Sequence, residues 1–321
     1  MTEPKDAPRP PGNARHYRRF LSTDPALRER LGDPFRPLEP ECRVVQFDAP
    51  LTPSQLARAG RLIADRPDIE LYVYGGVWRD LSFLKHFKTV QRLHIALYEL
   101  QDIAGFSDAR WLRELTFGET RKKFSLRVVE TWPLLRRLFL VRHKTDLACI
   151  SGLAELENLG LSGITLPDLS LLLPLGKLRA LQLFLGGTTG LGALAKLPLL
   201  EELRMMRVTK LSELGILADL AGLRRLHLDW MRNVVSLPNL GGLSRLEAVK
   251  LDTMKGLTEL VSIAAAPALR RLEIGGMPQL TADNFRCFIG HPRLCELLIQ
   301  TGRRGVDAAV REMLPQIARR F

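Results

Sequence analysis

A pattern of apolar residues, apolar-x-x-apolar-x-apolar, returns ten times along this chain at a nearly constant interval. An eleventh, degenerate copy fits Asp68, Leu71 and Val73. A period of this length is typical of solenoids, in which each repeat buries its apolar side only against its neighbours. The ten copies begin at Val90, Leu112, Leu135, Leu156, Leu178, Leu200, Leu223, Leu246, Leu269 and Leu294, in steps of 21 to 25 residues.

The order of residues within a copy predicts a short strand. Successive side chains of a strand point to opposite faces, so the fourth and sixth residues are expected to point into the core and the third, fifth and seventh outward. The returning segment has leucines about three residues apart with Gly or Pro nearby, as at Leu191 and Leu194. It is too short for a long helix and predicts 3₁₀ turns or brief helices opposite a parallel sheet.

These copies resemble leucine-rich repeats, whose units begin LxxLxL and run for about 20 to 29 residues. The resemblance covers residues 68–300 and implies an α/β solenoid, a right-handed leucine-rich-repeat horseshoe with a concave parallel sheet and a cap at each end. Many family members carry Asn or Cys at the ninth position, whereas here no copy does and five have an apolar residue. We therefore expect neighbouring repeats to be joined mainly by packing. The five are Ile164, Val208, Met231, Met254 and Met277.

The segments outside the repeats predict the remaining organisation. Residues 1–13 are rich in Pro and are expected to be disordered. Residues 14–67 predict an N-terminal cap with a weak helical stretch, a strand at CRVVQF and a helix capped by Thr52 and begun by Pro53. Residues 301–321 predict a helical cap with one apolar face, in which Pro315 is a point where the helix could kink. The residues of that face are Val306, Val310, Met313, Leu314 and Ile317.

The sequence has no segment typical of a membrane span or a signal peptide. No run approaches the length of a transmembrane helix, and the N-terminus has Pro and charged residues where a signal peptide needs an apolar stretch. We therefore expect a soluble, cytoplasmic protein, and we expect it to be a monomer.

Motifs that would indicate catalysis are incomplete. GLGALA from Gly190 fits GxGxxA, but it falls in register with other repeat turns and lacks a βαβ unit with a ribose-binding acid. The six His and four Cys residues show no short metal-ligand spacing. The sequence predicts a non-enzymatic protein with no cofactor or metal site, whose cysteines are reduced and mostly buried.

The outward positions of the strands predict a binding face. They combine aromatic side chains with arginines, as interface hot spots do. Some of these rings could instead be covered by loops or help the strands to pack. The predicted partner-binding residues are Tyr72, Tyr74, Arg92, His94, Arg137, Phe139, Phe184, Arg204, Met206, Arg225, His227, Trp230, Lys250 and Arg271.

The formal net charge of +12 is unevenly distributed. Residues 110–144 contain ten Lys or Arg and three Glu, which gives 10 − 3 = +7. This excess predicts a basic patch, formed by Arg121, Lys122, Lys123 and Arg127, that favours acidic partners. A solvated, arginine-rich face explains the same residues equally well.

The leading hypothesis is a non-enzymatic scaffold that recognises a protein through the concave strand face. One alternative is a secreted bacterial effector or toxin-neutralising protein delivered into another cell. The other is an electrostatic binder of nucleic acid or an anionic surface through the basic patch. Protein ranks above nucleic acid because nothing in the sequence resembles a base-stacking module.

Overall fold

The computed structural model describes residues 18–21, 33–130 and 132–320, which form two compact units. Unit 1 comprises the described residues up to Leu135, and unit 2 begins at Arg136. The predicted disordered segment, residues 1–13, lies outside the described residues.

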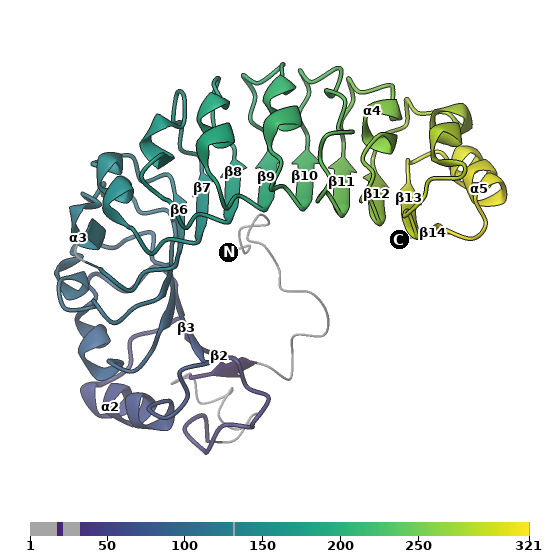
Figure 1. Cartoon of the computed structure of the whole chain (residues 1–321). Helices are drawn as coiled ribbons and strands as arrows, with labels where there is room; N and C mark the ends of the chain where they lie inside the picture. The colour runs from purple at the N-terminus through teal and green to yellow at the C-terminus, as the bar shows by residue number, and fades with distance from the viewer. Residues whose placement is uncertain (1–17, 22–32, 131, 321) are drawn as a thin grey trace. The chain divides into compact units, whose positions relative to one another are not determined.

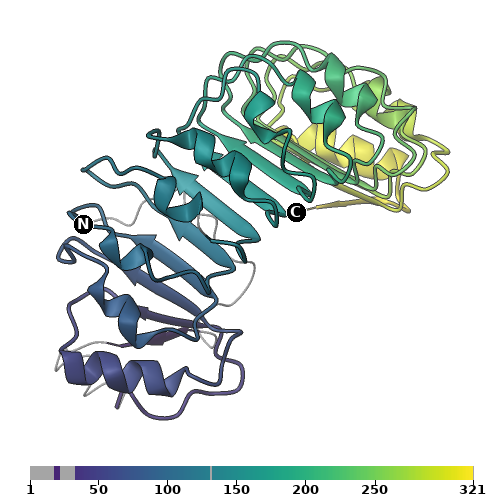
Figure 2. The ribbon, with the colours of Figure 1, turned by 60° about the vertical axis from the view of Figure 1, so that its left-hand side comes forward.

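Unit 1 contains a parallel sheet whose strands pair in chain order, with its helices on one side of the sheet (Figures 1 and 2). Its strands are β1 (Arg18–Phe20), β2 (Val44–Phe47), β3 (Glu70–Tyr74), β4 (Arg92–Ala96) and β5 (Glu114–Phe117). Its helices are α2 (Pro53–Leu62), the 3₁₀ helices η1 (Ser82–His86) and η2 (Ala104–Phe106), and α3 (Arg127–Glu130).

Unit 2 repeats this arrangement with more strands, again paired in parallel and in chain order. The strands are β6 (Arg137–Val141), β7 (Asn158–Ser162), β8 (Ala180–Phe184), β9 (Glu202–Met206), β10 (Arg225–Asp229), β11 (Ala248–Asp252), β12 (Arg271–Gly275), β13 (Glu296–Gln300) and β14 (Ala318–Arg320). The helices are η3 (Leu147–Gly152), η4 (Ser170–Leu172), η5 (Gly192–Lys196), η6 (Gly215–Asp219), α4 (Val261–Ala264), η7 (Ala282–Phe288) and α5 (Arg304–Met313).

The predicted strand geometry is confirmed. In β10, Leu226 and Leu228 are buried, whereas Arg225, His227 and Asp229 reach solvent to different degrees. Equal positions of neighbouring repeats pair, so His227 lies opposite Arg204 on β9 and Lys250 on β11. Each outward position therefore forms a row of side chains across the sheet. The predicted return segments are also confirmed, because they contain 3₁₀ helices and short α-helices.

The ninth position packs into the core, as expected where the polar residue common in the family is missing. Ile164, Val208 and Met231 are buried there. Packing is not the only link between repeats, however. Within each unit, carbonyl oxygens of second-position residues accept bonds from the next repeat, as when Glu201 receives the N–H groups of Arg224 and Arg225 at 2.8 and 3.0 Å. Backbone hydrogen bonds therefore continue beyond the strands and join the turns.

Charged side chains at the second position add a further link in unit 2. Arg and Glu alternate there from Arg136 to Arg270, which brings side chains of opposite sign together. The ion pairs are Arg136 with Glu157 at 3.5 Å, Arg179 with Glu201 at 2.9 Å and Arg224 with Glu247 at 2.7 Å. Exposed pairs of this kind contribute up to about 1 kcal/mol each.

The eighth position, directly after each strand, has a left-handed backbone in most repeats. Its φ is 65° at Gly163 but also 55° at Leu185 and 52° at Trp230, where a side chain makes this conformation less favourable. The turn directs the N–H of this residue to the next repeat, and Trp230 donates to the carbonyl oxygen of Asp252 at 2.9 Å. The strained backbone thus places Trp230 at the end of β10.

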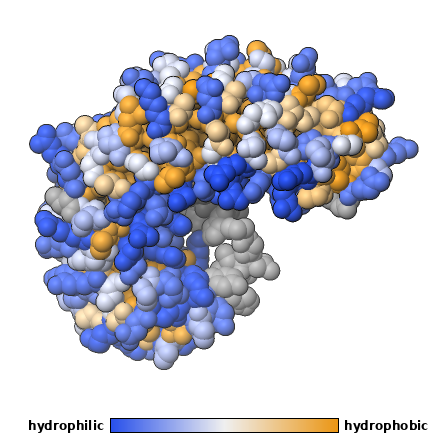
Figure 3. Space-filling model, in the orientation of Figure 1, coloured by the Kyte–Doolittle hydropathy of each residue, from blue (hydrophilic) through white to orange (hydrophobic). Residues whose placement is uncertain are grey.

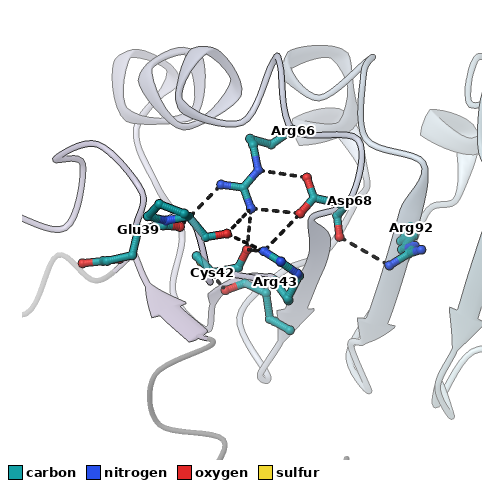
Figure 4. A network of polar contacts seen from close by, with 8 residues as sticks. Glu39, Cys42, Arg43, Arg66, Asp68 and Arg92 are labelled. Carbon is teal, nitrogen blue, oxygen red and sulfur yellow. Dashed lines mark hydrogen bonds and ion pairs between the residues drawn. The ribbon is translucent and has the colours of Figure 1, made fainter.

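The N-terminal cap is joined to the first repeat through Arg66 (Figure 4). Thr52 and Gln55 form the capping box of α2, as the predicted helix start requires. Beyond α2, the Arg66 guanidinium makes two hydrogen bonds to the Asp68 carboxylate, at 2.8 and 2.9 Å, and one to the carbonyl oxygen of Cys42 at 2.6 Å. Where the sequence suggested a weak helical stretch, residues 18–20 form strand β1, and residues 22–32 lie outside the described part.

The C-terminal cap combines a helix and a strand. Val310 and Leu314 are buried beneath the end of α5, which ends at Met313 rather than continuing past Pro315. Proline cannot donate the backbone bond that a helix needs. The chain then adds β14 to the sheet beside β13, an element that the helical pattern did not predict.

No helix within residues 18–21, 33–130 and 132–320 combines the length and apolar character needed to cross a bilayer. Cys42 and Cys149 are buried, Cys287 is partly exposed and Cys295 is exposed. The expectation of mostly buried thiols is therefore wrong for Cys295.

Candidate functional site

The predicted partner-binding residues fall into two groups, one on each unit. Those on unit 1 surround a small aromatic cluster. The ring of Tyr72 lies 5.0 Å from that of Tyr74 and 4.2 Å from that of His94. His94 also faces Glu70 at 3.4 Å, and Arg92 faces Glu114 at 3.2 Å. The imidazole of His94 and the guanidinium of Arg92 therefore already contact carboxylates of the same sheet.

The larger group lies on the outward face of unit 2, which we call the strand face and define as the third, fifth, seventh and eighth positions of β6–β13. Figure 3 shows hydrophilic side chains gathered along this side of unit 2. The predicted residues here are Arg137, Phe139, Phe184, Arg204, Met206, Arg225, His227, Trp230, Lys250 and Arg271, and each occupies one of these positions.

An aromatic group covers the first strands of this face. The ring of Phe139 lies over Gly160, where an added Cβ would meet the ring carbon Cδ2 at 2.1 Å. It reaches to 6.0 Å from the Phe184 ring, and the guanidinium of Arg204 lies 5.4 Å from that ring on the other side. Phe184 is consequently only 6% exposed. The expectation that Phe184 presents an exposed ring is wrong, because Phe139 and Arg204 cover it.

Two arginines contact the Trp230 ring. The guanidinium of Arg207 lies 3.7 Å from the centre of its ring and that of Arg232 lies 5.7 Å away. Cation–π contacts of this kind are favourable and also fix the ring in place. The tryptophan remains partly exposed, so it offers a rigid apolar surface between two cations. The sequence prediction named Trp230 but missed Arg207 and Arg232. These two arginines occupy different positions of their repeats, so they do not fall in one row across the sheet.

The fifth-position row places His227 between two cations. Burial, together with the charges of Arg204 and Lys250, lowers the pKa of His227 from its ordinary 6.5 to about 4. The imidazole is therefore neutral at pH 7. Lys250 lies 3.2 Å from Glu273, which Arg271 also contacts at 2.7 Å.

The seventh-position row contains two carboxylates on neighbouring strands, Asp229 and Asp252. Burial and the adjacent Asp252 charge raise the pKa of Asp229 above its ordinary value. Asp252 accepts a hydrogen bond from the hydroxyl of Thr253 at 2.7 Å. Neither aspartate was among the predicted site residues, because that prediction was based on aromatic and basic side chains.

Unsatisfied polar atoms also gather on this part of the face. The Nε of Arg204, the Nε2 of His227 and the Nε1 of Trp230 are enclosed and have no hydrogen-bond partner among the described residues. Enclosed polar atoms are usually paired, and exceptions call for an explanation. Three of the seven atoms of this kind among the described residues thus lie on β9, β10 and the turn after it, beside Asp229, and we take the centre of the strand face as the candidate site.

The basic segment 110–144 divides between the two units, and the predicted patch of Arg121, Lys122, Lys123 and Arg127 lies in unit 1. Arg121 contacts Glu99, while the amino groups of Lys122 and Lys123 donate to the carbonyl oxygens of Gln101 and Thr120 at 2.7 and 3.2 Å. All three side chains are exposed, as is that of Arg127 at the start of α3. Local contacts thus engage Arg121, Lys122 and Lys123, while Arg136, Arg137, Arg142 and Lys144 belong to unit 2.

The chain has the leucine-rich-repeat fold, which its repeats and sheet define. Among solved structures, an internalin from Listeria monocytogenes matches with a TM-score of 0.51 at 15% identity, over 81% of this chain and 74% of that one. A leucine-rich-repeat protein from Leptospira interrogans matches with a TM-score of 0.46 at 14% identity, over 88% and 90% of the two chains. No protein-family model matches the sequence, and no curated protein is similar to it.

Proposed function

We propose that this chain is a non-enzymatic scaffold that binds a protein partner through the strand face of unit 2. The observation that carries the proposal is the partly exposed Trp230 ring, which the guanidiniums of Arg207 and Arg232 contact. Tryptophan and arginine are the residues most enriched at the energetic centres of protein interfaces. A ring already fixed in the free protein loses little further conformational entropy on binding.

The neighbouring side chains support the same proposal. Phe139 is partly exposed beside the almost covered Phe184, and Met206 lies next to Asp229 on the adjacent strand. The face thus combines apolar area with charged groups, the composition of an interface centre with a polar rim.

Affinity capture from the native cell extract tests the proposal. The wild type is compared with a double variant, Phe139→Ala and Trp230→Ala, which removes two partly exposed rings and leaves Phe184 unchanged. A Val235→Ala, Val261→Ala variant is the matched control, because both valines are exposed, at 60% and 64%, outside the strand face. We expect the ring variant to lose a protein that the wild type and the control retain. Equal capture by all three would contradict the assignment of the face.

The electrostatic alternative makes a different prediction for the same experiment. Binding through Arg121, Lys122 and Lys123 would weaken steeply with added salt and would not respond to the ring variant. Cytoplasmic location and delivery into another cell also remain predictions. Secretion that depends on residues 1–35 would favour delivery.

A further inference from the structure

Carboxylates on the sheet of unit 2 follow a regular pairing rule. At the second, third and fifth positions each glutamate from β7 to β13 contacts a basic side chain. These contacts are Glu157–Arg136 at 3.5 Å, Glu201–Arg179 at 2.9 Å, Glu202–Arg225 at 2.8 Å, Glu247–Arg224 at 2.7 Å, Glu273–Lys250 at 3.2 Å and Glu296–Arg271 at 2.9 Å.

Asp229 and Asp252 depart from this rule. They occupy paired positions of β10 and β11, so that two negative charges lie side by side. The Asp229 carboxylate has no hydrogen bond or ion pair with the described residues, and Asp252 accepts only the hydroxyl of Thr253. Like charges in directly paired positions destabilise a sheet. The free protein thus holds an unfavourable arrangement that a positive charge would relieve.

The nearby cations are directed toward other groups. Arg204 lies against the Phe184 ring, Arg207 lies against the Trp230 ring, and Lys250 contacts Glu273. They influence the aspartates through space, but none forms an ion pair with either carboxylate among the described residues. A cation for this pair must therefore come from outside the sheet.

The two aspartates lie between apolar side chains and glycines. On β12, the residue beside Asp252 is Gly275, and an added Cβ there would meet the Asp252 Oδ2 at 2.9 Å. The next residue, Gly276, also lacks a side chain. On the other side, Met206 pairs with Asp229, and Trp230 follows it directly. Two carboxylates are thus flanked by an apolar wall and a strip of glycine backbone.

We propose that the protein partner places an arginine or lysine side chain on Asp229 and Asp252, with the aliphatic stem of that side chain against Trp230 and Met206. This inference rests on the proposed function of the strand face. It specifies the partner's chemistry as a basic segment, even though this protein is itself basic. A guanidinium matches two carboxylates particularly well, because its planar donors can bond both.

A library of random 12-residue peptides displayed on phage, selected on the full chain, tests this inference. Selected peptides are synthesised and their affinities measured for the wild type, for Trp230→Ala and for the double variant Asp229→Asn, Asp252→Asn. The control variant Glu155→Gln, Asp283→Asn makes the same change in net charge at exposed carboxylates outside the strand face. Each selected peptide is also prepared with citrulline, the neutral isostere, in place of arginine, or with norleucine in place of lysine.

We expect the selected peptides to contain Arg or Lys, and the double aspartate variant to weaken their binding by about tenfold or more. The neutral peptides should lose as much, and the control variant should bind normally. Peptides whose affinity falls with Trp230→Ala but not with the aspartate variant would overturn this inference and would still support the proposed function. Peptides indifferent to both Trp230→Ala and the aspartate variant would contradict both, and a selection without basic peptides would overturn the inference.

Discussion

Replacing Asp229 by Asn should make the free protein more stable at neutral pH. Asn keeps the shape of the side chain and removes one of two adjacent negative charges on β10 and β11. Neighbouring strands are about 4.8 Å apart. Two unit charges about 5 Å apart repel by about 0.8 kcal/mol in water and by about 3 kcal/mol at an effective dielectric constant of about 20.

Favourable contacts reduce this gain. Arg204 and Lys250 stabilise the Asp229 charge, but burial and Asp252 outweigh them, because the pKa of Asp229 is raised rather than lowered. The carboxyl is partly solvated, which screens the repulsion. We therefore expect Asp229→Asn to raise the free energy of unfolding by about 1 kcal/mol at pH 7.

The pH dependence distinguishes this cause from a change in packing. Because the pKa of Asp229 is raised in the folded state, the protonated carboxyl contributes stability below the ordinary value of 3.8, and that contribution is lost as pH rises through the folded pKa. The advantage of the Asn variant should thus grow as pH rises from 4 to 7.

Urea denaturation followed by circular dichroism at several pH values between 4 and 7.5 measures the difference. The Glu155→Gln variant, which removes an exposed carboxylate paired with Lys177, is the control for the overall change in charge. A variant that is less stable than the wild type at pH 7, or whose advantage does not change with pH, would refute the reasoning.

Three other substitutions test separate parts of the structure. Leu228→Ala, in the fully buried sixth-position row, should lower the free energy of unfolding by about 2 to 5 kcal/mol in urea denaturation. Gly160→Ala should displace the Phe139 ring, change the near-ultraviolet circular dichroism and cost about 1 kcal/mol. Arg66 lowers the pKa of Asp68 to about 2, which stabilises the fold above pH 3.8, and this contribution is lost as pH falls through 2, so Asp68→Asn should cost about 0.5 kcal/mol at pH 7 and less at pH 2. An unaltered spectrum, or a cost as large at pH 2 as at pH 7, would contradict the last two.

The repeat pattern predicted the backbone well because each leucine position has a single physical role. Leu226 and Leu228 must be buried for neighbouring repeats to stack, so their spacing fixes the strand and its outward residues. The left-handed turn was not predicted, although Gly75, Gly163 and Gly276 at the eighth position were a usable signal. The alternating charges at the second position were visible too, but their pairing depends on the register between strands.

The site was less predictable because it depends on side chains from different repeats. Phe184 is covered because Phe139 lies over Gly160, and no pattern within one repeat reveals this contact. Trp230 was identified as an outward residue, but its two arginines come from the preceding repeat and the following turn. The aspartates of β10 and β11 stand out only when their neighbours are seen to be paired.

Site-specific photo-crosslinking tests most directly whether the strand face of unit 2 contacts the partner. The photoreactive residue p-benzoylphenylalanine replaces Gln182, an outward fifth-position residue of β8, or Val261, which is exposed at the start of α4. The account predicts that the captured partner crosslinks at position 182 and not at position 261. Crosslinking at position 261 alone would contradict it and place the binding surface on the return segments.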